Sequence, residues 1–184
     1  RRINLIIDIQ NCIKAQESKG YEHWSKIYNL KQAAKTLNFL TENNLTTYED
    51  LETAANKIHS DFDNTAQKIK AVEKTIGENA ILIKQLEIYR QYRPIYLKLQ
   101  KVKNKEGFTR KFQRELILYE AAERNLKGKN PPPLETLIKD NGDLSDRKSK
   151  LYEEYKKLKS KAAEIEVIRS NVDTLLNRPR ERNP

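Results

Sequence analysis

Apolar side chains recur from Leu51 onward at intervals that alternate between four and three residues. The series comprises Leu51, Ala55, Ile58, Phe62, Thr65, Ile69, Val72, Ile76, Asn79, Ile83, Leu86 and Arg90. This spacing is the seam of a heptad repeat, in which one stripe of a long helix faces a partner helix. A continuous helix over this region would span roughly 80 Å. Because a compact domain of this length has a radius of gyration of about 16 Å, the pattern predicts an elongated molecule.

A second heptad series occupies the C-terminal part of the chain. It comprises Leu144, Lys148, Leu151, Tyr155, Leu158, Ala162, Ile165, Ile168, Val172 and Leu175. One spacing slip, between Ile165 and Ile168, is expected to overwind the helix locally. Two long seams in one chain pair most simply as an antiparallel coiled coil.

Two shorter helical patterns precede the first seam. Apolar residues share a helical face over 3–16 and again over 21–42, and the turn-forming residues 18–20 separate the two. Together they predict a helical hairpin. Thr47 follows as the predicted N-cap of the long helix, because acidic residues occupy the next turn.

Helix-breaking residues divide the rest of the chain. Gly77 is expected to weaken the long helix, and Pro94 to kink or break it around 92–94. Beyond a turn at 103–107, Thr109 is the predicted N-cap of a helix that runs to Lys127. A short helix after three prolines is expected to end at the Asn-Gly pair at 141–142, so that the last helix starts near residue 143.

These elements predict an all-α protein. The expected parts are a hairpin base at 1–45, a coiled-coil stalk that pairs 46–89 with 144–177, a small helical head at 90–143 and a disordered tail at 178–184. Hydrophobic residues make up 37% and charged residues 34% of the chain, with 5 Gly and 6 Pro. This composition is typical of long helices with thin seams.

Basic residues concentrate where the long helix ends. The net charge is +10, and residues 90–114 contain nine basic side chains against Glu106 alone, a net of +8. Residues 42–88 contain nine acidic and five basic side chains. Clustered cations of this kind favour contact with phosphates. The candidate DNA-binding residues are Arg90, Arg93, Lys98, Lys101, Lys103, Lys105, Arg110, Lys111 and Arg114.

Three tyrosines, Tyr89, Tyr92 and Tyr96, alternate with arginines in the same region. Such aromatic side chains can stack on bases while guanidinium groups contact phosphates. The alternative, which helical spacing favours, is that they form one face packed on the aromatic residues of the head, Phe108, Phe112 and Tyr119.

Catalytic and metal-binding patterns are not found in the sequence. His23 and His59 lack neighbours at ligand spacing, and no glycine-rich phosphate loop is present. We therefore predict no catalytic residue, cofactor or metal. The single Cys12 is expected to be a buried thiol in a reducing cytoplasm. The longest apolar cluster, at 3–13, is interrupted by polar residues, so no membrane insertion is expected.

Several segments resemble the region that follows the nuclease domain in relaxases (mobilization nucleases) of Gram-positive conjugative and mobilizable elements. They are INLIIDIQ at 3–10, GYEHW at 20–24, NLKQAAKTL at 29–37, and Ile168 with NVD at 171–173 and Leu175 with Leu176. In that family an N-terminal domain nicks one DNA strand with a tyrosine, helped by a metal held by histidines. No residue of this chain matches those motifs, so no catalytic residue is carried over.

The resemblance implies a C-terminal accessory region of a bacterial, cytoplasmic relaxase that assists binding of DNA or of other relaxosome and transfer proteins. The absence of methionine and the start at Arg1 agree with the expectation of a fragment. The alternative hypothesis is a coiled-coil interaction or dimerisation module that does not contact DNA. A third is a structural coiled coil unrelated to DNA. The sequence leaves the oligomeric state open.

Overall fold

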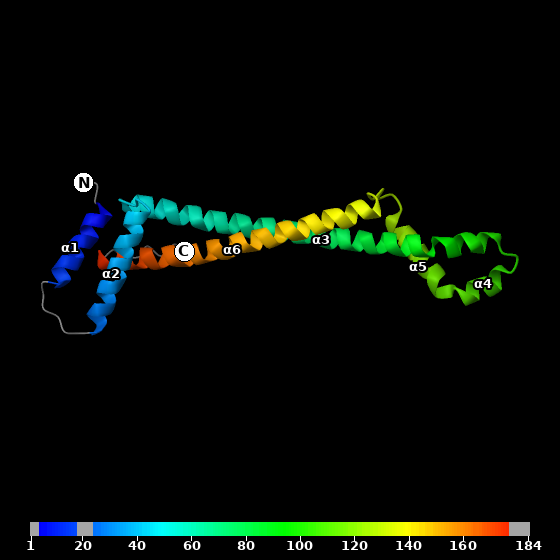
Figure 1. Cartoon of the computed structure of the whole chain (residues 1–184), viewed down its shortest axis with the longest axis horizontal. Coiled ribbons are helices and arrows are strands. Elements are labelled where there is room, and N and C mark those ends of the chain that lie inside the picture. The colour runs from blue at the N-terminus through cyan, green and yellow to red at the C-terminus, as the bar shows by residue number, and fades with distance from the viewer. Residues whose placement is uncertain (1–3, 18–23, 177–184) are drawn as a thin grey trace, which may run out of the picture. The chain divides into compact units, whose positions relative to one another are not determined.

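The computed structural model describes residues 4–17 and 24–176, and within these ranges all regular secondary structure is helical. The prediction of an all-α fold is confirmed. Six helices follow one another along the described chain (Figure 1): α1 (Leu5–Glu17), α2 (Trp24–Glu42), α3 (Tyr48–Lys101), α4 (Lys105–Lys111), α5 (Gln113–Leu126) and α6 (Leu134–Leu175). The predicted break at 18–20 and the predicted tail at 178–184 lie outside the described residues.

The chain forms two compact units. Unit 1 comprises residues 1–66 and 153–184, and unit 2 comprises residues 67–152. Because α3 and α6 are long, each contributes residues to both units. The predicted seam residues of α3 and α6 are buried or half-buried, except for the exposed Arg90.

Unit 1 contains a continuous apolar core to which four helices contribute. Its fully buried members are Leu5 and Ile9 of α1, Leu40 of α2, Leu51 and Ala55 of α3, and Ile165, Ile168 and Val172 of α6. The helices α1 and α2 contact one another, as the hairpin prediction requires. Beside this core, the buried Thr36 hydroxyl accepts a hydrogen bond from Asn171 Nδ2 at 3.1 Å, which links α2 to α6.

The long helix α3 begins with a reciprocal cap. The backbone N–H of Asp50 donates to Thr47 Oγ1 at 3.1 Å, and the backbone N–H of Thr47 donates to Asp50 Oδ2 at 2.9 Å. Hydrogen bonds from Thr47 and Thr46 hold the pKa of Asp50 below its ordinary value. This arrangement is a capping box, and it confirms Thr47 as the N-cap.

Within unit 1, α3 and α6 run antiparallel. Tyr48 Oη donates to Asp173 Oδ1 at 3.1 Å, and the next turns bring Glu52 to Arg169 at 2.8 Å and His59 to Glu166 at 2.9 Å. Residue numbers therefore rise along α3 while they fall along α6. This order is the register expected of two paired seams in one chain.

Unit 2 repeats the antiparallel order. Glu73 of α3 accepts a hydrogen bond from Tyr152 at 3.0 Å and lies 3.8 Å from the Lys148 ammonium group. Farther along α3, Arg90 pairs with Glu135 of α6 at 2.8 Å. The helix α5 packs on α3 through the buried Tyr119.

The predicted helix end at 141–142 is wrong, and so is the break that was one of the two outcomes expected at Pro94; a kink at Pro94 stays a prediction. The helix α6 runs through Asn141 and Gly142 without interruption, and α3 runs through Pro94 to Lys101. Glycine costs about 1 kcal/mol in a helix. The seam residues on either side of Gly142, and the stacked Tyr89 and Tyr96 on either side of Pro94, hold these helices together through tertiary packing.

The predicted start of a helix at Thr109 is also wrong. The helix α4 starts earlier, at Lys105, because the backbone N–H of Gly107 donates to the side chain of Asn104 at 2.9 Å. Asn104 is therefore the N-cap. A separate helix, α5, starts at Gln113 after a turn at Phe112.

Candidate nucleic-acid interface

All nine candidate DNA-binding residues lie in unit 2, and all are exposed. The C-terminal part of α3 carries Arg90, Arg93, Lys98 and Lys101; the connection to α4 carries Lys103; α4 carries Lys105, Arg110 and Lys111; and α5 carries Arg114. The structure thus brings residues from three helices and one connection into a single unit.

A stack of tyrosine rings fixes α5 on the basic part of α3. The Tyr119 ring stacks with Tyr89 at 5.1 Å and with Tyr96 at 4.6 Å between ring centroids. Tyr89 and Tyr96 therefore act in packing, as the second interpretation of the tyrosines proposed. Their predicted partners Phe108 and Phe112 instead contact each other, at 4.6 Å.

Tyr119 is neutral in this stack. Burial, followed by interaction with the Tyr89 hydroxyl, raises the pKa of Tyr119 well above its ordinary value. Its hydroxyl donates to Glu123 Oε1 at 3.3 Å. The phenol thus supports the position of α5 without adding a charge near the cations.

Two of the nine cations form ion pairs with carboxylates. Arg90 contacts Glu135 at 2.8 Å, and Arg110 contacts Glu106 at 3.4 Å. The pKa of Glu135 is lowered by a backbone hydrogen bond and then by Arg90. In the part of the chain that the structure describes, the other seven have no carboxylate within 4.0 Å. Their charge is available to an anionic partner.

Aromatic rings orient two of these uncompensated cations. The Arg93 guanidinium carbon lies 5.8 Å from the centroid of the Tyr89 ring, and Lys111 Nζ lies 5.5 Å from that of Phe112. Cation–π contacts at these distances hold the side chain near the ring while leaving its charge uncompensated. They restrict the positions of both cations on the surface.

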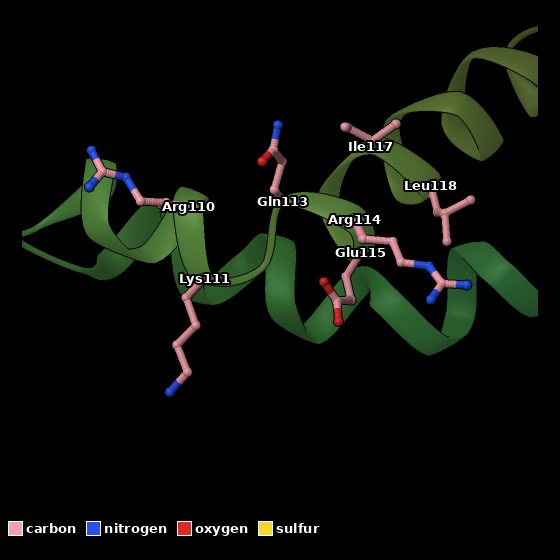
Figure 2. Close-up of a pocket in the computed structure, with 7 residues that line it drawn as sticks. All are labelled: Arg110, Lys111, Gln113, Arg114, Glu115, Ile117 and Leu118. Carbon is pink, nitrogen blue, oxygen red and sulfur yellow. The ribbon is translucent and has the colours of Figure 1, made fainter.

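An open pocket of about 560 Å³ lies where α4 meets α5. Arg110, Lys111 and Arg114 contribute cations to it, Gln113 and Glu115 contribute polar groups, and Ile117 and Leu118 contribute apolar surface. Figure 2 shows Gln113 and Ile117 pointing to one side of α5, and Lys111 and Glu115 pointing to the other. The sequence prediction included the three cations and missed the other four residues. The one available signal was Ile117, an exposed apolar residue outside the face of α5 that is buried through Leu116, Tyr119 and Ala122.

The charge of the chain is concentrated in unit 2. Residues 67–152 contain 20 basic and 11 acidic side chains, so this unit carries +9 of the total net charge of +10. The interface residues are therefore part of a unit that is positive as a whole, and long-range attraction of anions is expected.

Other site classes find little support. No cluster of metal-ligating side chains occurs among residues 4–17 and 24–176, and no helix there is long and apolar enough to cross a membrane. Cys12 is only partly buried, and its Sγ lies 3.6 Å from the carbonyl oxygen of Leu175. No protein-family model, curated protein or solved structure matches this chain.

Proposed function

We propose that this chain is a non-catalytic accessory region of a DNA relaxase that binds nucleic acid through the basic surface of unit 2. The observation that carries the proposal is the concentration of exposed cations on α3, α4 and α5, in a unit with a net charge of +9. Uncompensated surface cations gain affinity for nucleic acid by releasing counterions from phosphates. The relaxase part of the proposal is supported by the resemblance of the helical segments described above.

The test is the affinity of the chain for labelled single-stranded and double-stranded DNA over a range of salt concentrations. A triple charge reversal at Lys101, Lys105 and Arg114 is expected to weaken binding by at least tenfold. It should also make the logarithm of affinity less dependent on the logarithm of salt concentration. These side chains are exposed, so the fold is expected to be unaffected.

Three exposed lysines of α6 in unit 1 provide a matched control. Reversal of Lys157, Lys159 and Lys161 changes the net charge of the chain by the same amount. This variant is expected to bind DNA with nearly the affinity of the unmodified chain. Equal weakening by the two triple variants would contradict a local interface and indicate a general effect of net charge.

The second candidate function is a dimerisation or interaction module. A specific observation favours it: Ile81 and Ile138 of unit 2 are 63% and 50% exposed. Dimerisation through the seams is not expected, because the chain's own helices already cover the seam residues within each unit, apart from Arg90. Light scattering is therefore expected to give the monomer mass of 21.6 kDa. A dimer mass would favour the second function.

A further inference from the structure

The pocket between α4 and α5 combines two kinds of surface that a phosphate contact alone does not require. Arg110 and Arg114 are exposed cations, whereas Ile117 is 56% exposed although it is apolar. Phosphate binding accounts for the arginines but not for an exposed branched aliphatic residue. A nucleotide carries both a phosphate and apolar C–H and ring surfaces.

The order of residues along α5 matches this combination. Gln113 and Ile117 form one row four residues apart, and Arg114 and Leu118 form the neighbouring row. In each row a polar group precedes an aliphatic side chain by one turn. Figure 2 shows the members of each row pointing in a common direction. A ligand lying along α5 therefore meets polar groups first and apolar groups one turn later.

Electrostatics place the phosphate end of such a ligand at the start of α5. Arg110 and Lys111 end α4, and Arg114 lies in the first turn of α5, so three cations line this end of the pocket. Arg110 also contacts Glu106 at 3.4 Å, but the two side chains are 82% and 88% exposed, so this pair is weak and leaves Arg110 open to a phosphate. Glu115 also lines the pocket, but it points with Lys111 away from Gln113 and Ile117. Among the residues that line the pocket, the side of Gln113 and Ile117 is therefore free of carboxylate groups, whereas Glu115 lies on the side of Arg114 and Leu118.

We infer that the pocket holds one nucleotide of the bound nucleic acid, with its phosphate beside Arg110 and Arg114 and its sugar or base against Ile117 and Leu118. This inference rests on the proposed function and specifies where a bound strand makes its apolar contact. Gln113 adds an uncharged hydrogen-bonding group beside the nucleotide.

The variant Ile117→Ala tests the apolar contact, and Ile138→Ala is its matched control. Both isoleucines belong to unit 2 and are exposed to a similar degree, 56% and 50%, but only Ile117 lines the pocket. We expect Ile117→Ala to weaken DNA binding about three- to tenfold, because it removes apolar contact area. The slope of affinity against salt should not change, since no charge is lost. Ile138→Ala should bind as the unmodified chain does.

The variant Arg114→Gln tests the other end of the pocket. It removes one phosphate contact, so we expect weaker binding together with a salt slope that is smaller by about 1. The two variants thus differ in their salt dependence, which a general loss of structure would not produce.

Methyl NMR of the unmodified chain is a second, independent measurement. Addition of a short oligonucleotide should shift the Ile117 methyl resonances and leave those of Ile138 in place. Equal behaviour of Ile117 and Ile138 in affinity and in NMR, with DNA still bound tightly, would overturn the pocket assignment and leave the proposed function intact. Failure of the unmodified chain to bind any DNA would overturn both.

Discussion

Unit 1 and unit 2 are built from the same two long helices but differ in their balance of basic and acidic residues. Unit 1 contains 16 basic and 15 acidic residues, whereas unit 2 contains 20 and 11. In unit 1, Arg169 contacts both Glu52 and Glu166, at 2.8 and 2.9 Å. In unit 2, most of the cations near the end of α3 have no carboxylate partner among the described residues. Net charge, rather than secondary structure, distinguishes unit 1 from the unit that we propose binds DNA.

The two units also differ in how completely their large apolar side chains are buried. All the large apolar side chains that are fully buried in the described part of the chain lie in unit 1: Leu5, Ile9, Leu40, Leu51, Ile165, Ile168 and Val172. In unit 2 the seam of α3 beyond Val72 is only half-buried. Leu116, Tyr119 and Leu137 are buried in unit 2, but burial along the α3 seam falls beyond Val72. Truncations of seam residues should therefore have different effects in the two units.

The largest expected effect comes from truncating the unit 1 core. Ile168→Ala removes a fully buried side chain and should lower the free energy of unfolding by about 3 kcal/mol. Ile83→Ala removes a half-buried seam residue of unit 2 and should cost about 1 kcal/mol. Urea unfolding followed by circular dichroism measures both. Equal losses would contradict the difference in burial.

The sequence predicted the seams because burial along a paired helix follows a regular period. Thr47 was predictable for a similar reason, since a cap depends on residues within one turn. Pro94 and Gly142 were misjudged because packing against distant residues overrides local helix propensity. Predicting helix ends from local signals fails wherever such packing is strong.

The candidate site also combines features that local sequence predicted with features that depend on residues distant in the chain. Eight of the nine cations lie outside the seams, so the sequence predicted their exposure. Arg90 belongs to the predicted seam of α3 and is nevertheless exposed. Its partner Glu135 is 45 residues away in the chain and could not be found by spacing. The pocket depends on the turn at Phe112, which separates α4 from α5 where the sequence predicted one helix.

Ion pairs across α3 and α6 should show the next largest difference between the units. The Glu52/Arg169 pair is bidentate, at 2.8 Å for both contacts, and each side chain is only 30% exposed. Burial lowers the pKa of Arg169, but the hydrogen bonds that its guanidinium donates to Glu166 and Glu52 outweigh burial and raise the pKa overall. A double-mutant cycle with Glu52→Gln and Arg169→Gln should give a coupling of about 1–2 kcal/mol.

The Arg90/Glu135 pair of unit 2 is the comparison. Its side chains are 71% and 72% exposed, so solvent and salt screen the interaction. The same cycle with Arg90→Gln and Glu135→Gln should give no measurable coupling. A coupling as large as that of Glu52 with Arg169 would show that exposure does not separate the two pairs.

Substitution of two half-buried asparagines should change the stability of the protein with opposite signs in the two units. In unit 2, the Asn141 side-chain oxygen is buried and has no hydrogen-bond partner in the described structure, so Asn141→Leu should stabilise the protein by about 1 kcal/mol. In unit 1, Asn171 donates to the buried Thr36, so Asn171→Leu should destabilise it by about 1 kcal/mol. Thermal unfolding of both variants gives the signs directly, and a shared sign would refute this contrast.

The smallest expected effect is the acid dependence that Glu166 contributes to unit 1. Burial acts to raise its pKa, but hydrogen bonds from His59 and Arg169 outweigh burial, so the pKa lies below its ordinary value of 4.5. A lowered pKa in the folded state stabilises the fold above pH 4.5, and this contribution disappears as the pH falls through the folded-state value. Glu166→Gln should therefore flatten the fall of stability below pH 4.5, by a small amount because the side chain is 46% exposed.

Glu164→Gln, at an exposed position of the same helix without an ion pair in the described structure, is the control. Identical acid profiles for the two variants would show that the contacts of Glu166 with His59 and Arg169 contribute nothing to the stability of unit 1.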